Sequence, residues 1–173
     1  MHLYKCILEE RVIFLTLREQ TCCFTGHRTI PKEELPELMI ELEHILQELI
    51  AGGIRYFGAG GALGFDMIAA ETVLRLRERW PYIRLILVLP CQDQNRGWRP
   101  ADTARYELIK ARANKVVYTA QIYGPDCMHR RNRHLVDNSS VCVAYCHRSS
   151  GGSAYTVDYA QRRGLRVILL GKQ

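Results

Sequence analysis

The chain has 173 residues, a formal charge of +6 and the apolar and charged fractions of an ordinary globular protein. This length predicts one domain with a full hydrophobic core that needs no disulfide or metal to fold. No apolar run approaches the roughly 20 residues that span a bilayer, and charges at residues 9–11 interrupt the apolar N-terminus, so we expect neither a membrane span nor a signal peptide. The sequence therefore predicts a cytoplasmic protein whose charge favours anionic partners: nucleotides, phosphates or nucleic acid.

The seven cysteines indicate free thiols rather than a disulfide framework, because several fall in or beside apolar strand-like runs. Cys142, Cys146 and His147 resemble a fragment of a metal site, but no second ligand pair follows at a recognisable spacing. We expect no metal and no cofactor.

Residues 1–19 are predicted to be an N-terminal extension, either an added strand over 12–17 or a segment upstream of the domain. A single domain is expected over residues 20–173, with strand and helix in regular alternation. The expected strands are 21–25, 54–57, 83–89, 115–118, 141–145 and 166–170. The expected helices are 35–51, 65–80, 101–113, 126–138 and 154–163. Strands rich in branched residues between helices predict an α/β Rossmann-like three-layer sandwich, a mostly parallel sheet with helices on both faces.

A first glycine loop covers residues 58–64, between an expected strand and an expected helix. Such a turn can hold a phosphate against the helix N-terminus, so Gly60, Gly61 and Gly64 are candidate ligand-binding residues. The loop is one residue out of register with the dinucleotide fingerprint and has no P-loop lysine, and a tight structural turn is the alternative. Asp66 either caps the following helix or accepts hydrogen bonds from sugar hydroxyls.

A second glycine loop, Ser150-Gly151-Gly152-Ser153, also joins a strand to a helix. Its hydroxyls and backbone amides form a second candidate anion site, and two such loops in one sheet support each other. A turn without a ligand is again the alternative.

Three further features are candidates for the same site. The first strand ends in Gly26-His27-Arg28, where Arg28 offers a planar fork for phosphate and His27 either donates a proton or makes a structural hydrogen bond. The helix that carries Arg131 is strongly basic, and one of its arginines can turn toward a phosphate. Trp98 either stacks on a base or packs under its own polar loop.

The motifs 25–28, 60–66 and 150–153, together with 69–71 and 156–160, resemble the YpsA family of the SLOG superfamily of Rossmann-like proteins. The resemblance covers residues 21–170. It implies a nucleotide or a nucleotide-derived ligand in the cleft marked by the glycine loops, and it adds Thr156 to the candidate binding residues.

The same superfamily includes the cytokinin-activating phosphoribohydrolases and the DNA-processing protein DprA. Residues 128–132 are similar to a phosphoribohydrolase motif and place Arg131 at its functional arginine, with Asn132 in place of lysine. In the second motif Asp158 falls at the catalytic glutamate. Since Asp is one methylene shorter, and about 1 Å of misplacement can cost two orders of magnitude in rate, binding carries over better than hydrolysis.

Three hypotheses follow. The first is a sensor or binding protein for a nucleotide or nucleotide-derived ligand. The second is an enzyme that cleaves the N-glycosidic bond of a nucleoside monophosphate, with Arg131, Asp158 and Asp66 as its catalytic residues. The third and weakest is single-stranded nucleic acid binding of the DprA type. A homo-oligomer is compatible with each, and a membrane partner is not expected.

Overall fold

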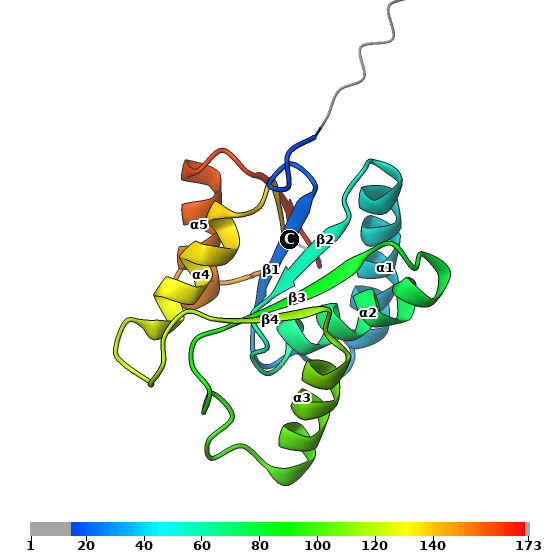
Figure 1. Ribbon diagram of the computed structural model, residues 1–173. Helices are drawn as coiled ribbons and strands as arrows, with labels where there is room; N and C mark the ends of the chain where they lie inside the picture. The colour runs from blue at the N-terminus through cyan, green and yellow to red at the C-terminus, as the bar shows by residue number, and fades with distance from the viewer. Residues whose placement is uncertain (1–14, 172–173) are drawn as a thin grey trace, which may run out of the picture.

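A computed structural model describes residues 15–171, in which six strands form one sheet in the order β4-β3-β2-β1-β5-β6. All five pairings between neighbouring strands are parallel, and five helices cover both faces of the sheet (Figure 1). The strands are β1 (Thr21–Gly26), β2 (Tyr56–Ala59), β3 (Arg84–Leu89), β4 (Lys115–Tyr118), β5 (Val141–Tyr145) and β6 (Arg166–Leu169). The helices are α1 (Leu35–Ala51), α2 (Phe65–Arg79), α3 (Pro100–Arg112), α4 (Cys127–Asp137) and α5 (Gly152–Arg162). The predicted Rossmann-like three-layer architecture is confirmed.

The first helix illustrates how the local sequence sets an element. Proline stands in the first turn of α1, where a missing N–H costs nothing, and Glu37 faces the positive end of the helix dipole. Leu38, Leu42 and Leu46 recur at helical spacing and are buried. The helix ends at Ala51 and Gly52 caps it, as the sequence predicts.

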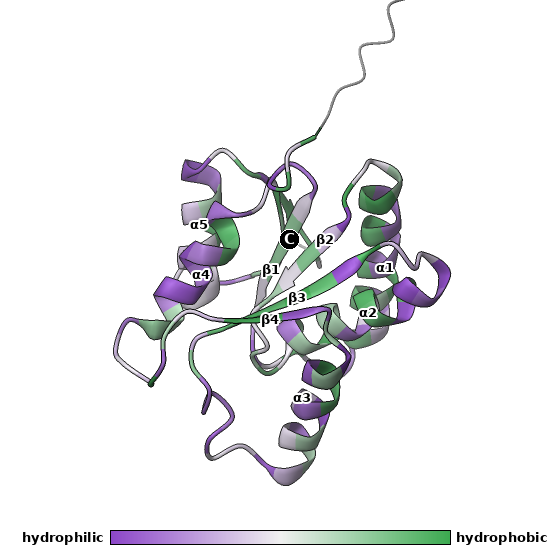
Figure 2. Ribbon diagram, viewed as in Figure 1, coloured by the Kyte–Doolittle hydropathy of each residue, from purple (hydrophilic) through white to green (hydrophobic). Residues whose placement is uncertain are grey.

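The two faces of the sheet have separate cores, as neighbouring residues of β1 show. Cys22 packs with the larger cluster under α1, α2 and α3, and Cys23 packs with the smaller cluster under α4 and α5. Successive side chains of a strand point to opposite faces, so both are fully buried. In Figure 2 the apolar colour accordingly runs along the central strands and the inner sides of the helices. The six cysteines in the described part of the chain are free thiols, of which Cys146 alone is not fully buried.

Strand β2 lies two residues later than predicted and includes Gly58. A β-carbon at Gly58 would lie 2.9 Å from the Leu135 side chain of α4. The absence of a side chain at Gly58 therefore lets α4 pack closely on the sheet. The glycine-rich turn itself begins after this residue.

The position of the site follows from the strand order. β1 is central and pairs with β2 on one side and β5 on the other, and the chain leaves β1 toward one face and reaches β5 from the other. The loops that follow β1 and β5 diverge here, so a crevice opens at the carboxyl ends of these two strands.

Within residues 15–171 no helix is long and apolar enough to cross a membrane. The strand proposed over 12–17 falls largely outside the described residues, and residues 15–17 are not in a strand. The division at residue 19 stays a prediction.

Candidate functional site

A cleft of about 410 Å³ opens at the carboxyl ends of β1 and β5. It is formed by the loop after β1, the start of α2, the inner face of α4 and the loop between β5 and α5. Its lining residues are Phe24, Thr25, Gly26, His27, Arg28, Thr29, Ala62, Asp66, Met128, Arg131, Asn132, Arg148, Ser150, Gly151, Gly152 and Ser153. Most residues singled out from the sequence thus lie together, although they come from four separate segments of the chain.

The second glycine loop presents an open helix N-terminus to this cleft. Gly151 adopts φ +98° and precedes α5, whose N-terminus has no side-chain cap among the described residues. A β-carbon at Gly151 or Gly152 would meet no atom within 4 Å. The first N–H groups of a helix have no partner inside the helix and carry the positive end of its dipole, so this end suits an anion.

The first glycine loop is filled by protein. A β-carbon at Gly60 would lie 1.2 Å from Nη1 of Arg131, and one at Gly64 would lie 2.3 Å from the carbonyl oxygen of Arg28. Gly61 and Gly64 have φ of +66° and +79°, and at Gly61 too a β-carbon would lie against side chains of the protein. Gly60, Gly61 and Gly64 do not line the cleft, and their contacts support the structural reading of this turn.

Asp66 and Arg131 form a buried ion pair at the base of the cleft. Nη1 of Arg131 donates to Oδ2 of Asp66 at 3.1 Å, and each residue is only 5% exposed. The backbone N–H of Ala62 also donates to Oδ2, at 3.3 Å. Burial raises the pKa of Asp66, while Arg131 and the Ala62 N–H oppose this rise. No described side chain caps α2, and Asp66 instead holds Arg131 in the space beside Gly60.

One donor of this pair has no partner. Nε of Arg131 is buried and makes no hydrogen bond with any described residue. The guanidinium is therefore fixed by one carboxylate, and one of its five donors is still short of an acceptor.

His27 makes the structural hydrogen bond that was one of its two predicted roles. Its Nε2 accepts the backbone N–H of His147 at 2.9 Å, which links the loops after β1 and β5. Burial, Arg148 and His147 lower the pKa of His27. At neutral pH the imidazole is therefore neutral and serves as an acceptor at this atom.

Arg28 and Arg148 flank the cleft with exposed side chains. Neither guanidinium forms an ion pair within residues 15–171. Arg28 was predicted, and Arg148 was missed as a ligand candidate. Its position directly between β5 and the second glycine loop is the signal that could have identified it.

Thr156 and Asn132 lock the open end of α5 onto α4. Nδ2 of Asn132 donates to Oγ1 of Thr156 at 2.9 Å, and this hydroxyl donates to the carbonyl of Gly152 at 2.8 Å. Thr156 is buried behind the cleft and positions the loop rather than lining the cavity.

Asp158 lies elsewhere. Its side chain is exposed on α5, pairs with Arg162 at 2.6 Å and does not line the cleft. The structure therefore does not bring Asp158 together with Arg131 and Asp66.

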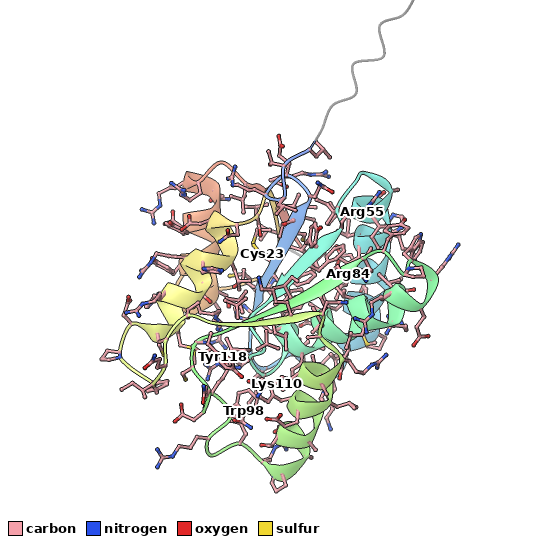
Figure 3. All side chains as sticks on the ribbon, viewed as in Figure 1. Cys23, Arg55, Arg84, Trp98, Lys110 and Tyr118 are labelled. Atoms are coloured by element: carbon pink, nitrogen blue, oxygen red, sulfur yellow. The ribbon has the colours of Figure 1, made fainter. Side chains whose placement is uncertain are left out.

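Trp98 lies in the loop before α3 (Figure 3). It packs under its own loop against the larger core, with its ring edge-on to that of Tyr106 and the two ring centroids 5.4 Å apart. It also lines a neighbouring pocket. Among the described residues no three metal-ligating side chains gather in one place.

Comparisons with known proteins identify the family and the fold of this chain. The model of the YspA SLOG family (YpsA) matches residues 24–166. A UPF0398 protein of Halalkalibacterium halodurans is 31% identical over 124 residues, which are 70% of this chain and 66% of that relative. The prophage-derived protein YoqJ of Bacillus subtilis, named as uncharacterised, is 26% identical over 139 residues, covering 73% of this chain and 81% of YoqJ.

Two solved structures of DNA processing protein A share the fold. The Helicobacter pylori protein, described with a single-stranded DNA binding mode, has a TM-score of 0.62 and 19% identity over 88% of this chain. The Streptococcus pneumoniae protein has a TM-score of 0.65 and 16% identity over 91% of this chain. The matches span 66% and 52% of those two chains.

Proposed function

This chain belongs to the YspA SLOG family, and we propose that it binds a nucleotide or nucleotide-derived ligand by a phosphate group in the cleft between β1 and β5, as a sensor or binding protein. One observation carries the proposal: the N-terminus of α5, uncapped by any described side chain, opens into the cleft beside Arg28 and Arg148, which pair with no carboxylate of residues 15–171.

The charges around the cleft favour an anion. Three arginines line it, and Asp66 is the one carboxylate among the described lining residues. Because Asp66 is already paired with Arg131, no described carboxylate offsets the charges of Arg28 and Arg148. A volume of about 410 Å³ lies in the range of small-molecule sites.

The same residues make binding a better supported function than glycosidic hydrolysis. A hydrolase of this kind needs a carboxylate at the sugar carbon or at a water. Asp66 is held in the ion pair, and Asp158 is exposed outside the lining. Hydrolysis would require one of them to move into the cleft.

Single-stranded nucleic acid binding is a second candidate. The shared fold with DNA processing protein A and the exposed arginines at the cleft favour it. In α4, however, Arg133 pairs with Asp126 at 2.8 Å, which reduces the charge that this helix offers to a strand of phosphates.

A thermal-shift screen with AMP, ADP-ribose and inorganic phosphate tests the proposal. Saturation to 100 times the dissociation constant stabilises the folded state by about 2.7 kcal/mol, which shifts the melting temperature measurably. We expect the double variant Arg28→Ala/Arg148→Ala to weaken binding at least about tenfold, since two charge-assisted contacts are lost. Arg166→Ala is the control for the loss of a positive charge. Arg166 is exposed at the start of β6, whereas the cleft lies at the carboxyl ends of the strands.

Four outcomes would contradict the proposal. One is no shift with any nucleotide, and another is equal weakening by Arg166→Ala. Release of free base from AMP, seen by chromatography, would establish the hydrolase. Affinity for an oligonucleotide that exceeds that for AMP and falls steeply with salt would establish the nucleic-acid function.

A further inference from the structure

A second pocket of about 330 Å³ adjoins the proposed phosphate cleft. Arg28, Ala62 and Met128 line both spaces, so only these side chains separate or join the two. The other lining residues are Asp93, Gln94, Arg96, Trp98 and Tyr123, from the loop between β3 and α3 and the loop before α4. The proposed phosphate contacts leave this pocket unused.

Two aromatic side chains stand in its wall. Trp98 is held in place by its edge-on contact with Tyr106 and by the larger core, so its indole is fixed in the wall of the pocket. Tyr123 is 62% exposed, in the loop before α4. A planar nucleobase gains affinity by stacking on such rings, whichever base it is.

Gln94 adds a buried hydrogen-bond acceptor without a partner. Its Nε2 donates to the carbonyl of Gly61 at 2.7 Å, which fixes the orientation of the amide. Its Oε1 has no hydrogen-bond partner among the described residues, and the residue is only 7% exposed. A buried acceptor left unpaired costs free energy, so a ligand that brings a donor to this atom is favoured.

The charge of the second pocket differs from that of the cleft. In the second pocket Asp93 stands against two arginines, Arg28 and Arg96, whereas in the cleft one paired aspartate stands against three, Arg28, Arg131 and Arg148. The carboxylate of Asp93 would repel a second phosphate in this pocket but not a neutral ring.

We propose that this pocket seats the base of the ligand whose phosphate occupies the cleft, with Trp98 and Tyr123 against the ring and Gln94 favouring an exocyclic amino group. The inference rests on the proposed function and narrows it to nucleotides of amino-bearing bases, such as adenine or cytosine.

Calorimetric titration with AMP, IMP and ribose 5-phosphate tests this assignment. AMP should bind at least about fivefold more tightly than ribose 5-phosphate, because only AMP carries a base to stack. Tyr123→Ala should remove most of this advantage and leave ribose 5-phosphate unchanged. Ile122→Ala is the matched control, because Ile122 is 79% exposed in the same loop and does not line the pocket.

Gln94→Met tests the acceptor. AMP should bind more tightly than IMP to the unmodified chain, because only adenine offers an exocyclic amino group, and this preference should shrink in the variant. Unchanged binding of ribose 5-phosphate by Gln94→Met shows that the cleft remains folded.

The outcomes separate this inference from the proposed function. Equal affinities for AMP and ribose 5-phosphate, equal weakening of both by Tyr123→Ala, or an unchanged AMP affinity in that variant would overturn the base pocket and leave the phosphate cleft standing. If none of the three ligands binds, the proposed function fails, and the base pocket fails with it.

Discussion

The two glycine loops of this protein make the same kind of connection in the fold, but protein atoms crowd one and leave the other open. Each joins a strand of the parallel sheet to the N-terminus of a helix. At Gly60 and Gly64 an added β-carbon would meet protein atoms at 1.2 and 2.3 Å, while at Gly151 and Gly152 it would meet none within 4 Å. A glycine-rich turn therefore indicates that other atoms can come close to its backbone. Residues from distant parts of the chain determine whether protein atoms fill that space or leave it open to a ligand.

The largest effect should come from Gly64→Ala compared with Gly151→Ala. Both glycines have positive φ, so both variants incur backbone strain of about 1–3 kcal/mol. Only Gly64 also abuts a backbone carbonyl, which adds about 1–3 kcal/mol of overpacking. Urea unfolding should therefore show a clearly greater loss of stability for Gly64→Ala. Equal losses would mean that the first loop is no more tightly packed than the second.

Asp66→Asn should cost about 3 kcal/mol, because it leaves the buried guanidinium of Arg131 without its counter-charge. The control is Asp158→Asn, whose exposed pair with Arg162 should contribute less than about 1 kcal/mol. Both are measured by urea unfolding at neutral pH. A larger loss from Asp158→Asn would contradict the structural role given to the buried pair.

Thr156→Val should cost about 1 kcal/mol of stability and also weaken ligand binding. The substitution preserves shape but removes the hydroxyl that joins Asn132 to the carbonyl of Gly152. Calorimetry on the variant checks the binding part. Unaltered affinity would show that the second loop needs no support from α4.

The smallest effect should be a pH dependence from His27. Its pKa is lowered in the folded protein, so the unfolded chain binds more protons just below the ordinary value of about 6.5. Stability should therefore fall as the pH drops through this range. His27→Gln, whose amide oxygen can still accept the His147 N–H, should show a shallower decline in melting temperature between pH 7.5 and 5.5. An equal slope in both proteins would show that His27 titrates with its ordinary pKa.

Local patterns made most of the fold predictable. Branched strands, helical leucine spacing and proline or glycine at helix ends act within a few residues, so the predicted strands and helices lie close to the observed ones. The position of Arg28 and of residues 150–153 at one sheet edge followed from the topology of parallel strands.

Other features depend on contacts between distant residues and could not be read from spacing. The guanidinium of Arg131 fills the space beside Gly60, which lies 71 positions earlier in the chain. Protein atoms therefore occupy the space that the sequence assigned to a phosphate. Asp158 followed from a resemblance of motifs, yet the orientation of α5 places it in solvent. The unpartnered Oε1 of Gln94 depends on the bond to Gly61, which no sequence pattern signals.

The most direct test of the central claim is a calorimetric titration of AMP into Gly152→Ala, with Gly124→Ala as its control. Both positions have open space for a methyl group and neither has positive φ, but only Gly152 lines the cleft. We predict unchanged melting temperatures for both variants, and a loss of AMP affinity of about tenfold or more for Gly152→Ala alone, because the methyl group blocks the approach of a phosphate to the α5 N-terminus. Unchanged AMP affinity in Gly152→Ala would contradict the phosphate site.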